Sequence, residues 1–213
     1  KPVENVSAYA SYSKSFLPRS GDQFLDLTDA NSQLEPEEFD NQEIGIKWDI
    51  HPSLSLTAAL FRLDRDTTER TADGEDSFVT TSQTEGFELQ LGGQASDRWR
   101  VDVGYSYLDS ELADGSARSQ VPTHMFSVWN RYDVSSQLGL GLGVTYQDEQ
   151  FASASNAVTV PDFTRVDAGI FYTLRNGTAL QLNVENLLDE DYYAAAHNDN
   201  NISPGAPLNA RLT

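Results

Sequence analysis

The chain of 213 residues contains no cysteine, three histidines, and 14 Lys and Arg residues against 33 Asp and Glu residues. The absence of cysteine excludes a disulfide scaffold, a thiolate zinc site and a cysteine nucleophile. His51, His124 and His197 are far apart in the sequence, and their spacing suits no zinc site. The net charge of −19 argues against nucleic acid as a partner, because phosphate neutralisation requires a basic face. We therefore predict that the chain is not an enzyme and holds no resident cofactor.

The chain also lacks a long apolar run, and its mean hydropathy is −0.48. A membrane-spanning helix needs about 18 or more consecutive apolar residues, so such a helix is excluded. Membrane β-strands escape this test, because their lipid-facing residues alternate with polar residues that face the lumen. A transmembrane β-barrel therefore remains compatible with the low hydropathy.

What the sequence does contain is an alternation of apolar and polar residues with a period of two. Between residues 138 and 146, Leu, Val and Tyr occupy the even positions, and Gly and Thr occupy the odd ones. This pattern indicates a β-strand with one apolar face and excludes a helix. It recurs in about ten segments, most clearly in 44–50, 87–91, 101–107, 166–172, 180–184 and 208–212.

The connections between these segments alternate in length. Short ones, rich in turn-forming residues, lie at 51–53, 96–98, 135–137 and 175–178. Long polar ones lie at 17–37, 69–76, 113–120, 152–157 and 194–204. An antiparallel up-and-down barrel produces this arrangement when one rim carries short periplasmic turns and the other carries long outer loops. The sequence therefore predicts an all-β, transmembrane up-and-down barrel wall.

Aromatic residues fit the same interpretation, because interfacial girdles of such barrels are rich in Trp and Tyr. One predicted girdle lies near the short turns and contains Trp48, Trp99, Trp129 and Tyr132. The other lies toward the long loops and contains Tyr107, Tyr146, Tyr192 and Tyr193. A soluble antiparallel sandwich is the alternative, but it does not explain the sorting of loops or a segment as long as 77–96, which exceeds the usual strand length.

Several stretches resemble the TonB-dependent siderophore receptors. They include LEPEEFDNQEIGIKW at 34–48, TEGFELQLGGQ at 84–94, HMFSVWNRYDV at 124–134 and DFTRVDAGIFY at 162–172. The most specific are LNVENLLDEDYY at 182–193 and NISPGAP at 201–207, because each combines a strand with its flanking loop. SFLPRSGDQF at 15–24 resembles the catecholate-type members.

The resemblance implies a 22-stranded barrel closed around an N-terminal plug. Residues 1–213 would form the C-terminal portion of that barrel, about ten consecutive strands, with the plug and the N-terminal strands absent and the last strand truncated. The implied function is uptake of ferric siderophores, with iron present only as part of the cargo. Implied partners are the ferric siderophore, the TonB–ExbB–ExbD complex acting through the absent N-terminal part, the lipid bilayer and lipopolysaccharide of the bacterial outer membrane.

A ferric siderophore is bulky and often anionic, so its site should combine basic and aromatic side chains on the long loops. The candidate ligand-binding residues are Arg19, Phe24, Arg70, Arg118 and Phe151. The charge of −19 conflicts with capture of an anion, unless the capturing cations are local, belong to the plug, or meet a less anionic ligand. Acidic stretches such as 35–40 and 189–191 are interpreted as a solvated rim rather than a calcium site.

Three other functions remain open from the sequence. A passive outer-membrane porin would show the same alternation, and a TonB-dependent receptor could carry another scarce nutrient. A soluble β-structured adhesin or binding module is the third class.

Overall fold

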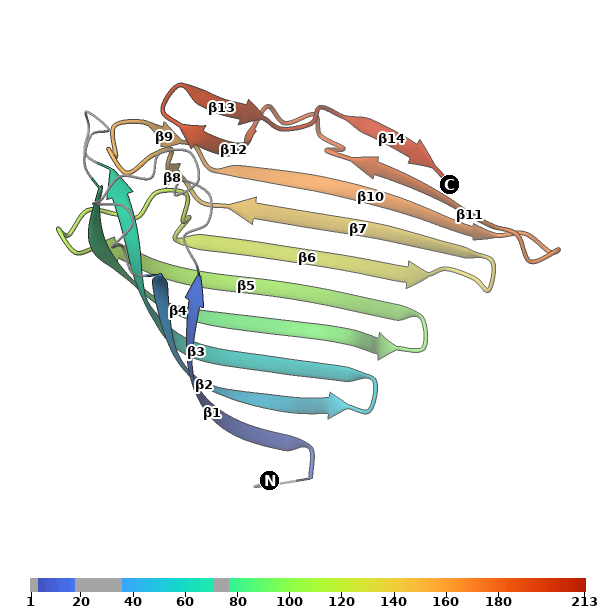
Figure 1. Ribbon diagram of the computed structural model, residues 1–213. Helices are drawn as coiled ribbons and strands as arrows, with labels where there is room; N and C mark the ends of the chain where they lie inside the picture. Colours follow the sequence, from blue (N-terminus) through green and yellow to red (C-terminus); the bar gives the residue numbers. More distant parts are fainter. Residues whose placement is uncertain (1–3, 18–35, 71–76) are drawn as a thin grey trace.

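The structure is a computed structural model that describes residues 4–17, 36–70 and 77–213, with backbone alone for 67–70 and 77–79. Ten strands form one antiparallel sheet in which each strand pairs with the next along the chain (Figure 1). This confirms the predicted up-and-down arrangement and the number of wall segments. The strands are β1 (Val6–Leu17), β2 (Glu37–His51), β3 (Leu54–Arg70), β4 (Ser77–Ser96), β5 (Trp99–Leu112), β6 (His124–Asp133), β7 (Leu138–Gln147), β10 (Phe163–Thr173), β11 (Ala179–Glu185) and β14 (Asn209–Leu212).

The two rims of this curved wall differ, as the loop lengths predict (Figure 1). All four short connections are turns between consecutive strands, such as the one between His51 and Leu54. Two of the predicted long polar loops are not plain loops, which corrects that prediction. Residues 152–157 are the tip of a hairpin formed by β8 (Gln150–Phe151) and β9 (Thr159–Val160). Residues 194–204 fall within a second hairpin, formed by β12 (Tyr193–Asn198) and β13 (Asn201–Pro204).

In a soluble domain most large apolar side chains are buried, whereas many of those in this sheet are exposed. On β7, Leu140 and Leu142 are 45% and 50% exposed, whereas Gly139, Gly141 and Gly143, which alternate with them, are buried. The apolar face continues on the neighbouring strand β10, because Leu142 pairs with Ala168 and Leu140 pairs with Ile170. A sandwich would bury this apolar face against a second sheet. Its exposure contradicts the sandwich and is what a wall surrounded by lipid requires.

We call the apolar face the outer face and the polar face the inner face. The inner side chains, among them Glu88, Asp102 and Thr145, line a hollow of about 630 Å³, so this face is the concave one. Among the residues that the structure describes, no helix is long and apolar enough to cross a membrane.

Glycines on the inner face make room for a large ring. A Cβ atom added to Gly141 or Gly143 would lie 2.5 Å or 2.6 Å from the indole of Trp129, so the ring lies flat against the glycine backbone. Trp129 therefore belongs to the inner face, and its predicted place in the lipid-facing girdle is wrong. Its register partners are Gly143 and Asp102, both on the inner face. Trp48, Trp99 and Tyr132 are exposed on the outer face beside the short turns, as predicted.

The lipid-facing band is tested by Leu142→Arg, halfway along β7. We expect this change to lower the free energy of unfolding of the protein in lipid vesicles by about 2–4 kcal/mol, because an arginine near the bilayer midplane is poorly solvated. The control Gln42→Arg lies on the same face but nearer the long-loop rim, where the cost should stay below about 1 kcal/mol. Guanidinium titrations followed by tryptophan fluorescence measure both, and equal costs would contradict the assignment of the faces.

Candidate functional site

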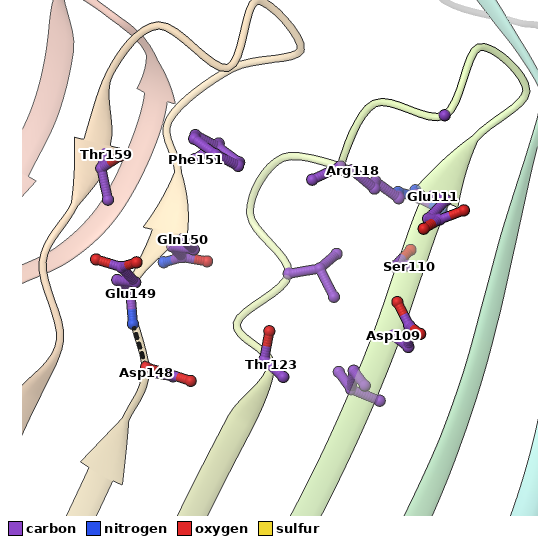
Figure 2. Close-up of a pocket in the computed structure, with 14 residues that line it drawn as sticks. Asp109, Ser110, Glu111, Arg118, Thr123, Asp148, Glu149, Gln150, Phe151 and Thr159 are labelled. Atoms are coloured by element: carbon purple, nitrogen blue, oxygen red, sulfur yellow. Dashed lines mark hydrogen bonds between the residues drawn. The ribbon is translucent and has the colours of Figure 1, made fainter.

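A pocket of about 290 Å³ lies at the long-loop rim, above the point where the β5–β6 pairing ends (Figure 2). The end of β5, the loop 113–123 and the segment that follows β7 surround it. Pairing between β5 and β6 stops at Tyr107 and His124, and beyond this point Glu111 of β5 pairs with Ala117 of the following loop instead. The pocket is lined by Leu108, Asp109, Ser110, Glu111, Gly115, Ala117, Arg118, Val121, Thr123, Asp148, Glu149, Gln150, Phe151 and Thr159.

The loop after β5 folds back on its own strand. The backbone N–H of Arg118 donates to the carbonyl of Ser110 at 3.0 Å, and that of Leu112 donates to the carbonyl of Ser116 at 2.8 Å. The Asp114 carboxylate accepts from both the hydroxyl and the backbone N–H of Ser116. These bonds, the hydroxyl first, hold the pKa of Asp114 below its ordinary value. The carboxylate therefore supports the turn at neutral pH and loses that support as the pH falls through its lowered pKa.

The same loop is joined to the β8–β9 hairpin across the pocket. The backbone N–H of Gln120 donates to the carbonyl of Phe151 at 2.9 Å. The side-chain amide of Asn156 donates to the carbonyl of Ala117 at 2.9 Å. Gln120 and Asn156 have φ angles of 60° and 52°, in the left-handed region that few residues other than glycine and asparagine adopt readily. Both of these left-handed residues make hydrogen bonds between the loop and the hairpin.

The chemistry of the pocket is mainly that of hydrogen-bond acceptors. Carboxylates of Asp109, Glu111, Asp148 and Glu149 line it, and Arg118 is the one basic residue among its described lining side chains. Arg118 donates to the hydroxyl of Ser82 at 3.0 Å, so the guanidinium is held in place beside the pocket. The pocket therefore suits a ligand surface that presents donors or positive charge, with an anionic group facing Arg118.

The sequence-predicted site residues have different outcomes. Arg118 and Phe151 come from separate loops and line one pocket (Figure 2), while their contact with a ligand stays a prediction. Arg19 and Phe24 lie outside the residues that the structure describes. Arg70 is the last residue of β3, and the structure describes its backbone but not its side chain.

Sequence reasoning missed the four pocket carboxylates, because they come from the ends of β5 and β7 rather than from the predicted loops. It also missed Gln120 and Asn156, for which the only signal is an asparagine within a run of small residues at 152–157. In the described part of the chain, no three acidic or histidine side chains converge as a metal site would require.

The two most specific sequence stretches, 182–193 and 201–207, meet beside the end of β10 that lies at the long-loop rim. The side chain of Asn186, which is 1% exposed, donates to the carbonyls of Glu190 at 2.9 Å and Ala206 at 3.1 Å and accepts from the N–H of Glu190. The ring of Tyr192 covers Gly205, where a Cβ atom would overlap it. The hydrogen bonds of Asn186 therefore hold the two stretches together.

Tyr192 does not belong to the lipid-facing aromatic girdle predicted near the long loops. Its hydroxyl accepts from Arg165 at 3.2 Å, and its ring centroid lies 4.5 Å from that of Phe163. Arg165 and Phe163 are inner-face residues of β10, since Arg165 pairs with Thr145 and Phe163 with Gln147. Tyr192 is therefore turned to the lumen side, which corrects the prediction.

Comparison with known proteins places this architecture in a family. Residues 1–187 match the family described as TonB dependent receptor-like, beta-barrel. The chain belongs to the TonB-dependent receptor β-barrel family. This membership confirms the resemblance seen in the sequence and counts against the porin and the soluble adhesin.

Two relatives of this receptor chain have known structures. The probable TonB-dependent siderophore receptor PiuA of Acinetobacter baumannii is 35% identical over 221 residues, which cover 92% of the chain and 30% of PiuA. The PiuA crystal structure superposes with a TM-score of 0.90 over 100% of the chain and 34% of that structure, at 33% identity. The catecholate siderophore receptor Fiu of Escherichia coli K12 is 30% identical over 233 residues, covering 99% of the chain and 30% of Fiu.

The Fiu crystal structure in its closed form superposes with a TM-score of 0.82 over 100% of the chain and 33% of that structure, at 28% identity. The receptor chain spans about a third of the length of the curated relatives it matches.

The role of Asn186 is tested by Asn186→Ala, which leaves the groups of Glu190 and Ala206 without their partner. We expect the 186–208 connection to open about tenfold more often or more, because unpaired buried backbone groups cost about 1–3 kcal/mol. Limited proteolysis of the receptor measures the rate of cleavage in this connection. Asn176→Ala, in an exposed turn where the side chain accepts from Thr178 N–H, should leave that rate unchanged, and equal rates in both variants would contradict the role.

Proposed function

We propose that the protein containing this chain is an outer-membrane receptor that imports ferric siderophores, most closely of the catecholate type, with energy supplied through TonB. The observation that carries the proposal is the combination of a lipid-facing wall with a preformed pocket at its long-loop rim. Membership in the receptor family supports it, as do relatives named as siderophore receptors. Iron enters only as cargo within the siderophore.

The described residues provide two parts of such a receptor. The wall supplies an apolar outer face toward the bilayer and a polar inner face toward the lumen, where Arg100, Arg131 and Arg165 each pair with an aspartate on the same strand. These pairs keep the lumen wall close to neutral, so an anionic cargo meets little repulsion there. Coupling to the TonB–ExbB–ExbD complex would act through a segment outside this chain. Lipopolysaccharide would contact the outer face above the apolar band.

The pocket supplies the means of capture in this proposal. Phe151 offers an aromatic surface for stacking on a catechol ring, and Arg118 offers a charge-assisted donor to its oxygens. The four carboxylates disfavour a complex whose exposed surface is uniformly anionic. We infer that the accepted ligand turns its anionic centre toward Arg118 and its donor groups toward the carboxylates.

The substrate class is tested in an iron-starved strain that lacks the receptor and carries it on a plasmid. We expect growth to be restored by ferric complexes of dihydroxybenzoate-based siderophores and not by hydroxamates or ferric citrate. A strain with the empty plasmid is the control. Growth on hydroxamates alone would contradict the catecholate assignment, and growth on none of the three would contradict siderophore import.

The role of the pocket is tested by Phe151→Ala in the complete receptor. We expect the Kd for a bound ferric catecholate to rise about tenfold, since loss of an aromatic stacking surface costs about 1.4 kcal/mol. The control Phe16→Ala removes an exposed ring near the same rim but on the outer face of β1, and its Kd should match the wild type. Quenching of tryptophan fluorescence measures both, and an unchanged Kd for Phe151→Ala would remove the pocket from the binding site.

A further inference from the structure

Three segments at the long-loop rim are joined to one another by hydrogen bonds and, in part, by a small apolar core. They are the loop 113–123, the connection 148–162 that contains β8 and β9, and the β12–β13 hairpin 193–204, together called the outer-loop unit (Figure 1). Ala152 and Val160 are 0% and 1% exposed and pack against Ala196, with Val158 and Ile202 around them. Within the described residues, this is where buried apolar side chains form a contiguous cluster. The core joins the second and third segments.

Hydrogen bonds join the segments further. The first and second are connected by Gln120 N–H to Phe151 O and by the Asn156 amide to Ala117 O, both at 2.9 Å. The Gln120 amide adds a longer contact to the carbonyl of Ala152 at 3.4 Å. The second and third are connected by the hydroxyl of Ser155, which donates to the Asp199 carboxylate at 2.8 Å.

Asn156 occupies the central position among these contacts. It lies at the tip of the β8–β9 hairpin, its amide also reaches the carbonyl of Ser153 at 3.4 Å, and its φ of 52° suits asparagine better than most residues. A residue that is strained in this way persists only where its surroundings fix it. The side chain thus connects the loop that carries Arg118 to the hairpin that carries Phe151, on opposite sides of the pocket.

We propose that Asn156 is a positioning residue that keeps the pocket preformed, so that the outer-loop unit receives the ligand as one rigid body. This inference rests on the proposed function, because it assigns the capture step of siderophore import to a surface that exists before the ligand arrives. The advantage is a lower cost of ordering loops and side chains on binding. The unit then discriminates ligands by the fixed separation of Arg118 and Phe151, and it does not close as a lid.

The affinity test uses Asn156→Gly in the complete receptor. Glycine tolerates the left-handed backbone, so the change removes the contacts of the amide without adding strain. We expect the half-saturating concentration for uptake of a ferric catecholate to rise about fivefold, which corresponds to about one hydrogen bond, while the maximal rate stays the same. The control Asn176→Gly removes a side chain that accepts from Thr178 N–H in a short turn outside the unit, and both parameters should remain at wild-type values.

The rigidity itself is tested without reference to transport, by hydrogen exchange on the free receptor. We expect the amides of Gln120 and Ala152 to be protected, and Asn156→Gly to accelerate exchange about fivefold in both 113–123 and 148–162. Acceleration confined to one segment would overturn the rigid unit. Adding a ferric catecholate to the wild type should change protection by less than about twofold outside the direct contacts, whereas a tenfold rise throughout the unit would mean that the loops order on binding.

These outcomes separate the two proposals. If the receptor binds no ferric siderophore, siderophore import fails, but exchange in the free protein still decides whether the unit is rigid. If binding is normal and the half-saturating concentration of Asn156→Gly equals that of the wild type, siderophore import stands and the positioning role of Asn156 is wrong.

Discussion

The backbone of a chain surrounded by hydrocarbon must satisfy its own hydrogen bonds, and the rest of this structure depends on that constraint. Each unpaired N–H or C=O group in lipid costs several kcal/mol, so the spanning segments are strands that pair with their neighbours. Pairing fixes the pleat, and the pleat sends alternate side chains to opposite faces. The outer face then has to be apolar and the inner face polar. The exposure of Leu142 and the burial of Gly141 both follow from this one requirement.

A wall of this kind gains little from a conventional core, so its inner face is organised by other means. Trp129 lies across the glycines of β7, where the missing side chains allow close contact. Arg131 stacks over Phe171 at 4.3 Å and pairs with Asp133 at 3.1 Å. Surface ion pairs of this type add little stability. Their effect is electrostatic, because each pair cancels a positive and a negative charge on the inner face.

The sequence predicts the wall well, because the information that defines a strand is local. Alternation identified the segments, and turn chemistry gave their boundaries to within a few residues. Trp129 was misassigned because its distance from a turn was considered without the parity of its position, which places it with Gly143 on the inner face. Tyr192 was assigned to the wrong face because its orientation is set by contacts with Arg165 and Gly205, and Arg165 is distant from it in the sequence.

The candidate site was predicted less completely, and the physical reason is that it is assembled from nonlocal contacts. Arg118 and Phe151 could be proposed because long loops carry binding residues in such barrels. Nothing local indicates that Asp109 and Glu111 at the end of one strand lie beside Asp148 and Glu149 at the end of another. The core of the outer-loop unit could not be predicted from the sequence either, because Ala152 and Ala196 are small residues in stretches with the composition of polar loops.

The location of that core also has a physical explanation. Inside the bilayer, burying an apolar side chain against protein gains little over leaving it in lipid, so the hydrophobic effect cannot stiffen the wall. Outside the bilayer, water restores the driving force, and burying a valine such as Val160 contributes about 1.5 kcal/mol or more. The apolar cluster therefore lies where water is present, in the segments at the long-loop rim. The wall derives its rigidity from backbone pairing, and the pocket derives its own from this cluster and from the contacts of Asn156.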